Sequence, residues 1–417
     1  MPVKNYPELW RVSDPKAWPS APTGMTFSLL SELEECPRRW ALGHAEYPEI
    51  WIGPGYPPRM HLPILVGNLI HSAIETITRA LAHEGCQSAY DAKAVEVMKN
   101  LGGYTNLIEI CMQRALDPYK GNPRSERVFD LIRDSLYGRT AEIRSQVQTL
   151  LGRVRLQGIQ ACSWGDQKPD PASRQRKPIS FGIHPEIEMQ AQDLGWRGRA
   201  DLVILSESYC EIVDFKTGLR SNKHGFQMRV YALLWHKDKE LNPTSRFANK
   251  LTLSYLDGDV DMPPPTRNDL TTLELEIKQR TRSALNALSA DPPSAKPHLE
   301  SCSLCDVRQL CKDYWQPAIH GNLTTGLTSV SQFTDAELTL LARHGTFSWN
   351  AAVNVLSNFQ PGTNVVLYVP TQHYLVNLAE PHDRLRILNA RISVDGEQNS
   401  QQEVITLNSM SEAFLVA

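Results

Sequence analysis

The sequence lacks any long hydrophobic run. No apolar stretch approaches the roughly 20 residues that a membrane-spanning helix needs, and the first residues, MPVKNYPELW, lack the pattern of a signal peptide. From these absences we expect a cytoplasmic protein without a membrane segment. With 417 residues, the chain is too long for one ordinary hydrophobic core, so we expect two domains and a helical insertion.

A strong excess of either charge is also missing. The net charge of −3 does not by itself indicate a nucleic-acid-binding protein. The distribution is uneven, however. Twelve Lys or Arg stand against six Asp or Glu in residues 120–177, whereas residues 320–417 hold four Arg, no Lys and eight acidic residues. Such an acidic tail is a poor clamp for phosphates and favours a protein partner.

Arginines recur along the basic segment, and they leave two interpretations open. They could line the wall of a DNA channel, contacting phosphates without reading bases. They could equally cover a solvated helix face with ion pairs four residues apart. The residues concerned are Arg124, Arg127, Arg133, Arg139, Arg144, Arg153 and Arg155.

Two apolar runs with carboxylates predict a β-hairpin. Residues 200–205 and 209–215 are the two strands, and residues 206–208 are the turn. Because successive strand residues point to opposite faces, Asp214 and Lys216 share a face while Phe215 enters the core. An antiparallel partner can place Asp201 beside Asp214. Two close carboxylates repel each other unless a cation lies between them, so we expect a site for Mg²⁺ or Mn²⁺.

These residues resemble the nuclease core of the PD-(D/E)XK superfamily, in its RecB-like branch. The similarity covers Asp201, the run Asp214-Phe215-Lys216-Thr217-Gly218, and Gln227 and Tyr231 at Q-x-x-x-Y spacing. It implies an α/β, restriction-endonuclease-like core, with a mixed central sheet flanked by helices, that cuts DNA with Mg²⁺ or Mn²⁺. It also implies that Asp201 and Asp214 are metal ligands, that Lys216 is the catalytic lysine, and that Gln227 and Tyr231 face the active site from the next helix.

An amphipathic helix is predicted over residues 66–85, upstream of the hairpin. It carries Gly67 and His71 at G-x-x-x-H spacing, as the iron-sulfur RecB-like nucleases do, and the resemblance implies that His71 is a third metal ligand. A lone helical histidine is otherwise more often structural. The strand predicted over residues 183–191 carries Glu186 and Glu188, and one of them could approach the metal.

Three cysteines lie close together near residue 300, as Cys302, Cys305 and Cys311. They can reach one metal centre, and Cys36, in the element Cys-Pro-Arg-Arg-Trp, is the candidate fourth ligand. Four thiolates suit a 4Fe-4S cluster or structural zinc. The split pattern resembles the iron-sulfur staple of AddB-type and CRISPR-associated RecB-like exonucleases, which favours 4Fe-4S over zinc. The other four cysteines are expected to be core thiols: Cys86, Cys111, Cys162 and Cys210.

The period of the hydrophobic residues, and the positions of proline, glycine and other turn-forming residues, predict further helices and strands. We predict a helix at 26–42 capped by Ser28 or Ser31, two or three helices within 87–160 with 106–115 and 125–151 the clearest, a mobile basic loop at 165–178, a helix at 223–239, a strand at 250–256 and a helix at 266–288. In the tail we predict a helix at 335–344 and strands at 364–369, 374–378, 385–394 and 403–407.

The predicted organisation has three parts: an N-terminal arm at 1–25, a nuclease domain at 26–318 with a helical insertion at about 87–160 and a cluster-binding end at 300–315, and a small β-rich domain at 319–417, for which an OB-like barrel is one candidate fold. The resemblance stops before the tail. It implies a nuclease that acts on DNA, single-stranded or with ends, in end processing, repair or defence against foreign DNA.

Two alternatives stay open at this point. The first is a catalytically silent nucleic-acid-binding or scaffold subunit of a helicase-nuclease or defence complex, with the C-terminal domain contacting a protein partner. The intact Asp201, Asp214 and Lys216 set argues against it, because a scaffold needs no such trio. The second is a nuclease whose cysteines hold zinc rather than iron.

Overall fold

The protein is described by a computed structural model over residues 7–155, 176–316, 334–356, 359–395 and 402–416. Most of the predicted basic loop at 165–178 lies outside these residues, as does Cys162. Within the described residues, no helix combines the length and the apolar character needed to cross a membrane.

A mixed five-stranded sheet forms the centre of the larger part of the chain, in the order β1-β2-β3-β4-β5. Only β3 and β4 run parallel, and helix α8 makes the crossover between them. The strands are β1 Gly182–Ala191, β2 Trp196–Leu205, β3 Cys210–Lys216, β4 Lys250–Tyr255 and β5 Gly258–Met262. The predicted hairpin and the mixed, helix-flanked sheet are therefore confirmed.

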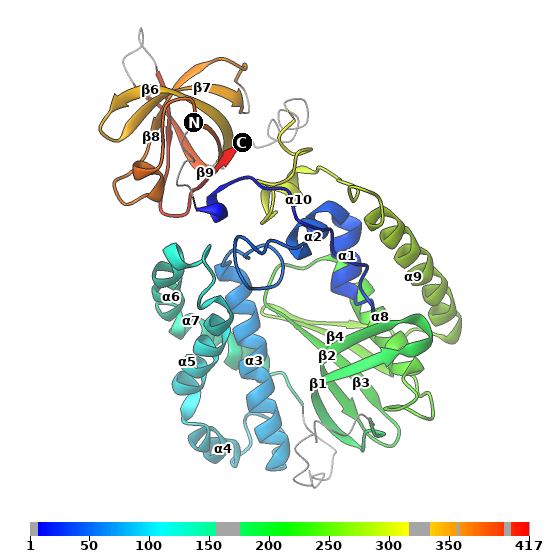
Figure 1. Ribbon diagram of the computed structural model, residues 1–417. Helices are drawn as coiled ribbons and strands as arrows, with labels where there is room; N and C mark the ends of the chain where they lie inside the picture. The colour runs from blue at the N-terminus through cyan, green and yellow to red at the C-terminus, as the bar shows by residue number, and fades with distance from the viewer. Residues whose placement is uncertain (1–6, 156–175, 317–333, 357–358, 396–401, 417) are drawn as a thin grey trace.

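Helices cover both faces of this sheet, and each face has its own apolar core (Figure 1). One face packs against α1 Phe27–Glu35, α2 Pro37–His44, α8 Asn222–Lys237 and α9 Arg267–Leu288. The other packs against α3 Leu62–His83, and the insertion helices α4 Ala94–Asn100, α5 Gly103–Leu116, α6 Phe129–Tyr137 and α7 Thr140–Leu151 pack in turn against α3. Short 3-10 turns lie at Glu8–Trp10, Asp117–Tyr119, Glu126–Val128 and Gln192–Leu194.

Several predicted helix details are wrong. The N-cap of α1 is Thr26, whose hydroxyl accepts a hydrogen bond from the Leu29 N–H at 3.1 Å, and neither Ser28 nor Ser31 has this role. The segment predicted as one helix at 125–151 divides into α6 and α7 near Gly138. The insertion contains four α-helices in the described residues instead of two or three.

The C-terminal part is a β-barrel. The strands are β6 Thr334–Gly345, β7 Ser348–Val355, β8 Asn364–Tyr368, β9 Arg384–Asp395, β10 Gln402–Thr406 and β11 Glu412–Val416. The sheet order is β10-β8-β7-β6-β9-β11, and the additional pairing of β10 with β9 closes a five-stranded ring. Within the ring, only β8 and β10 are parallel. The β-rich C-terminal domain is thus confirmed.

Two predictions for the tail are wrong. The segment 335–344, predicted as a helix, belongs to strand β6, which pairs with β7 on one side and β9 on the other. The segment 374–378, predicted as a strand, contains the 3-10 turn Tyr374–Asn377. Its tyrosine hydroxyl donates to the Ala413 carbonyl at 2.7 Å, which ties the turn to β11.

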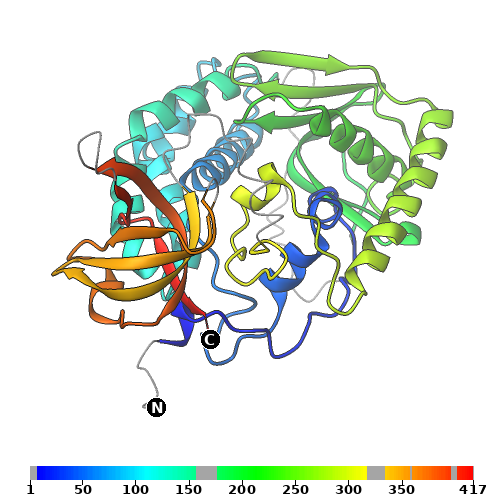
Figure 2. The same ribbon diagram turned by 90° about the horizontal axis from the view of Figure 1, so that it is seen from above.

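The cysteine-bearing segment lies between the barrel and the nuclease part, next to the short helix α10 Leu299–Ser303 (Figures 1 and 2, yellow). Arg38 of α2 pairs with Asp313 at 3.2 Å, and His61, just before α3, contacts Asp306 at 2.6 Å. On the barrel side, Arg308 pairs with the buried Asp335 of β6. This one segment therefore connects α2, α3 and the barrel.

Candidate active site

The two carboxylates of the hairpin lie where its register predicts. Leu202 pairs with Val213, so the next residues along the strands, Asp201 and Asp214, are opposite each other. Oδ2 of Asp201 accepts a hydrogen bond from the Phe215 N–H at 2.6 Å. This bond links β2 to β3 and fixes the Asp201 carboxylate beside the end of the D-x-K strand.

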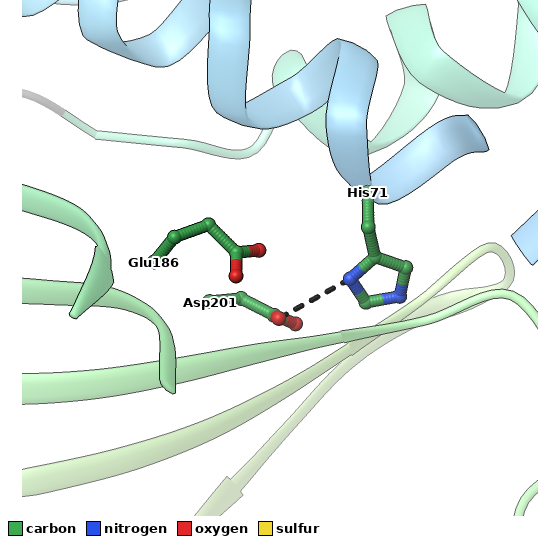
Figure 3. Close-up of side chains that lie close together, drawn as sticks. All are labelled: His71, Glu186 and Asp201. Atoms are coloured by element: carbon green, nitrogen blue, oxygen red, sulfur yellow. Dashed lines mark hydrogen bonds and ion pairs between the residues drawn. The ribbon is translucent and has the colours of Figure 1, made fainter. Parts of the chain in front are cut away.

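His71 of α3 approaches Asp201 from the helical side. Its Nδ1 lies 3.2 Å from Oδ1 of Asp201 (Figure 3). Gly67, one turn earlier, allows this approach, because a Cβ at that position would lie only 3.3 Å from Oγ1 of Thr217. Burial alone would lower the pKa of His71, but the hydrogen bond and the charge of Asp201 outweigh burial and raise it.

Glu186 of β1 completes a group with His71 and Asp201. One ligand atom from each of the three residues lies within 4.8 Å of the other two (Figure 3). Burial, followed by the charge of Asp201, raises the pKa of Glu186 to about 7, even though Arg199 lies 2.7 Å away. Three oxygen and nitrogen donors this close suit a divalent cation. Sequence analysis indicated Glu186 only weakly, as one of two glutamates.

A backbone irregularity places Glu186 in this group. Its φ is +52°, in the left-handed region that non-glycine residues rarely adopt. Ile183 and Met189 are six residues apart, so in a regular strand both would point to the same face. Instead, Ile183 packs in the core on the α3 side and Met189 packs on the α8 side. Alternation along the sequence therefore does not predict where Glu186 points. Residues held in such a conformation often belong to functional sites.

Asp214 is almost completely buried on the next strand. Burial, followed by the charge of Asp201, raises its pKa to about 6, while Lys216 opposes the shift. Nζ of Lys216 lies 2.6 Å from its Oδ2. Apart from this ion pair, Oδ2 is a buried acceptor without a hydrogen-bond partner among the described residues. A buried carboxylate oxygen with spare acceptor capacity fits a role as a cation ligand.

Lys216 is held by a second contact that comes from helix α8. Its Nζ donates to Oε1 of Gln227 at 2.9 Å, and Nε2 of Gln227 donates to the Tyr231 hydroxyl at 2.7 Å. Gln227 and Tyr231 are one helical turn apart and both are buried. The Q-x-x-x-Y spacing thus gives a hydrogen-bond relay, Lys216–Gln227–Tyr231. This relay fixes the Lys216 ammonium group between α8 and Asp214.

The four candidate cysteine ligands border one cavity. It is lined by Cys36, Cys302, Cys305 and Cys311, and also by Arg38, Arg39, Lys296 and Arg308. Among the described residues, no three of these sulfurs lie within 4.8 Å of one another. A single tetrahedral zinc with Zn–S bonds of about 2.3 Å would place them about 3.8 Å apart. Three of the remaining cysteines, Cys86, Cys111 and Cys210, are buried as predicted.

The arginines of the insertion do not form one continuous DNA wall. Arg124 is fully buried against Glu412 of β11. Arg127 donates to the carbonyls of Ser409 and Ser411, and Arg133 pairs with neighbouring aspartates of its own helix. The arginine-rich segment therefore serves in part to hold the C-terminal barrel.

One of the comparisons with known proteins identifies a family for this chain. No curated protein matches the chain. One similar solved structure, "Crystal structure of SSO0001", is 19% identical and covers 32% of this chain, and the chain spans 61% of that structure, with a TM-score of 0.21. A similarity this low carries no argument about fold or function. The profile of the PD-(D/E)XK nuclease superfamily, by contrast, matches residues 25–312, well over half of the chain. The chain therefore belongs to the PD-(D/E)XK nuclease superfamily.

Proposed function

We propose that this protein is a Mg²⁺- or Mn²⁺-dependent nuclease that hydrolyses phosphodiester bonds of DNA. The observation that carries the proposal is the convergence of His71, Glu186 and Asp201 within 4.8 Å, with the ion pair of Asp214 and Lys216 on the adjacent strand. Enzymes of this superfamily use divalent metals, and the donors gathered here are the hard oxygens and imidazole that such ions accept.

The metal would be held by His71, Asp201 and Asp214, with Glu186 as an additional ligand. When bound, it would act as a Lewis acid on the phosphate and lower the pKa of a water molecule. The protein's own contribution is to keep these side chains in place before the substrate arrives. The bond from the Phe215 N–H to Asp201 and the close approach of Gly67 to Thr217 do this.

Lys216 would orient the attacking water and stabilise the charge that develops on the phosphate. Its Nζ is fixed between Oδ2 of Asp214 and Oε1 of Gln227, so it does not need to reorganise during the reaction. Tyr231 in turn holds Gln227, because its hydroxyl accepts a hydrogen bond from Nε2 of Gln227. Burial raises the pKa of its hydroxyl strongly, so the group stays protonated and can accept the Gln227 bond throughout.

A groove next to the metal group offers a path for the substrate. It has a volume of about 500 Å³ and is lined by α3 residues, including Ser72, Glu75 and Arg79, together with Arg114 and Pro185. Ser72 follows His71 and Pro185 precedes Glu186, so the groove borders the helix and the strand that carry two residues of the metal group. Its two arginines can contact phosphates without reading bases, as expected for a nuclease that acts on a strand or an end.

By resemblance to the RecB-like nucleases, the four candidate cysteines would hold a 4Fe-4S staple. They line one cavity together with basic side chains, which would offset the negative charge of a metal-thiolate centre. Binding would tie α2 to the segment behind the nuclease core. Iron, sulfide and zinc analysis after anaerobic purification tests this. Zinc without iron would contradict it.

The C-terminal barrel has the strand number and closure of an OB-like fold, and we propose it as a separate accessory domain spanning 319–417. Its acidity favours a protein partner, such as a helicase or a defence-complex subunit, over DNA. By resemblance, end processing, repair and defence against foreign DNA are the corresponding roles of the whole protein.

Cleavage assays on single-stranded and duplex DNA with Mn²⁺ test the proposed function. The wild type should cut, and Lys216→Ala should lose more than about a hundredfold of the rate. Lys99→Ala, which changes an exposed lysine of α4 outside the site, is the matched control. A wild type that binds DNA but never cuts it would instead support the silent scaffold.

A further inference from the structure

The loop of residues 217–221 joins β3 to α8 immediately after Lys216. Both of its ends are fixed. Thr217 lies against Gly67 of α3, and the hydroxyl of Ser221 accepts a hydrogen bond from the Lys223 N–H at 3.3 Å, which caps α8. The loop is therefore held at both ends, directly after the proposed catalytic lysine.

Leu219, near the middle of this loop, is 93% exposed. A single exposed leucine is ordinary on a protein surface. This one, however, lies three residues after Lys216 on a loop whose ends are fixed. It offers an apolar side chain, close in the sequence to the proposed catalytic lysine, that packs little against the other described residues.

Arg220 follows Leu219 directly, and two contacts orient its guanidinium group. Its guanidinium lies 5.2 Å from the centre of the Tyr255 ring, and it pairs with Asp257 at 3.1 Å. Tyr255 in turn pairs with Lys216 in the sheet and makes a 2.8 Å hydrogen bond with His224. Arg220 and Asp257 are both more than half exposed, and such a pair contributes little, so a phosphate can replace Asp257 at small cost.

We propose that residues 217–221 form a lip that holds an unpaired DNA strand next to the scissile phosphate. Arg220 binds a neighbouring phosphate, and Leu219 packs against the face of an unstacked base. Single-strand-binding proteins combine these two kinds of contact, because every base has an apolar face. In an intact duplex those faces are covered by stacking, so the lip selects a single strand or a frayed end. This inference rests on the proposed nuclease function and names its substrate class.

Binding measurements on the full-length protein in EDTA separate the two contacts. Fluorescence anisotropy would compare a labelled single strand with a blunt duplex of the same sequence over a range of salt concentrations. Arg220→Ala should weaken binding of both and lower the slope of log K against log salt by about 0.7 for the single strand. Arg220→Lys should keep the slope. Leu219→Ser should weaken single-strand binding about fivefold or more and leave the duplex affinity and the slope unchanged.

Two variants are matched controls. Leu275→Ser changes an exposed leucine of α9, and Arg133→Ala removes an exposed arginine that also pairs with aspartates. Both should behave as the wild type, and thermal melting should show that all variants fold. Unchanged single-strand binding in Leu219→Ser, or an unchanged slope in Arg220→Ala, overturns the lip. If the wild type nevertheless cuts DNA with Mn²⁺, the proposed function stands without it. A wild type that binds no DNA overturns both.

Discussion

The guanidinium of Arg124 donates two hydrogen bonds, at 2.8 and 2.9 Å, to the carboxylate of Glu412 across 288 residues of chain. Both side chains are buried, and Arg59 lies 3.3 Å from the same carboxylate. Arg124 also donates to the Asp306 carbonyl beside the cysteine segment. The helical insertion, the cysteine segment and the barrel therefore meet at one buried ion pair.

Removing one partner of this pair should destabilise the protein. Arg124→Met leaves the Glu412 carboxylate without its main partner, and we expect a loss of about 3–5 kcal/mol in the free energy of unfolding, measured with urea. Arg133→Ala, at an exposed pair, should leave the free energy of unfolding nearly unchanged. A loss below about 1 kcal/mol in Arg124→Met would show that the junction does not stabilise the fold.

The same pair should make stability depend on acid pH. Burial alone would raise the pKa of Glu412, but Arg124 and Arg59 together bring it from 4.5 to about 2. A depressed carboxylate pKa contributes stability above the unfolded pKa of 4.5, and that contribution disappears as pH falls from 4.5 toward 2. The difference in unfolding free energy between the wild type and Glu412→Gln should therefore shrink over this range. A constant difference would argue against the shift.

Glu186 should contribute directly to metal binding. Glu186→Gln removes one of three donors that lie within 4.8 Å of one another, and we expect Mn²⁺ affinity, measured by calorimetry without DNA, to fall at least about tenfold. Glu188→Gln, exposed on the same strand, is the control and should bind Mn²⁺ as the wild type does. Equal affinities for the two variants would remove Glu186 from the site.

Gln227 should act by positioning Lys216. Gln227→Leu keeps the volume but removes the acceptor of the Lys216 bond, so we expect kcat to fall about tenfold with little change in KM. Tyr231→Phe should have a smaller effect, because it touches only Gln227 in this relay. Gln190→Leu, whose amide instead donates to Glu240, serves as the control. A rise in KM alone would point to substrate binding.

Much of the site could be predicted from the sequence, because side-chain direction in a regular strand has a period of two. That period correctly put Asp214 and Lys216 on one face and Phe215 in the core, and the register brought Asp201 opposite Asp214. It fails at Glu186, where a left-handed backbone changes the face of the strand. Nothing in the amino-acid composition of the strand indicates that its residues change face at Glu186.

The wrong prediction for β6 has a similar cause. The segment DAELTLLARH is rich in residues that favour helices, yet it forms a strand between β7 and β9. Asp335 and Glu337 are buried there beside apolar residues because Arg308 and Arg386 pair with them. Arg386 comes from the neighbouring strand β9 and Arg308 from the cysteine-bearing segment, so tertiary contacts override the local preference.

Cleavage by Asp214→Asn, compared with the wild type in Mn²⁺ at equal thermal stability, tests the central claim most directly. Asparagine preserves the shape of this buried side chain but removes the charge that would bind the cation and hold Lys216. The expected result is a folded protein whose cleavage rate is reduced more than about a hundredfold. An Asp214→Asn variant that cuts DNA as fast as the wild type would contradict the account.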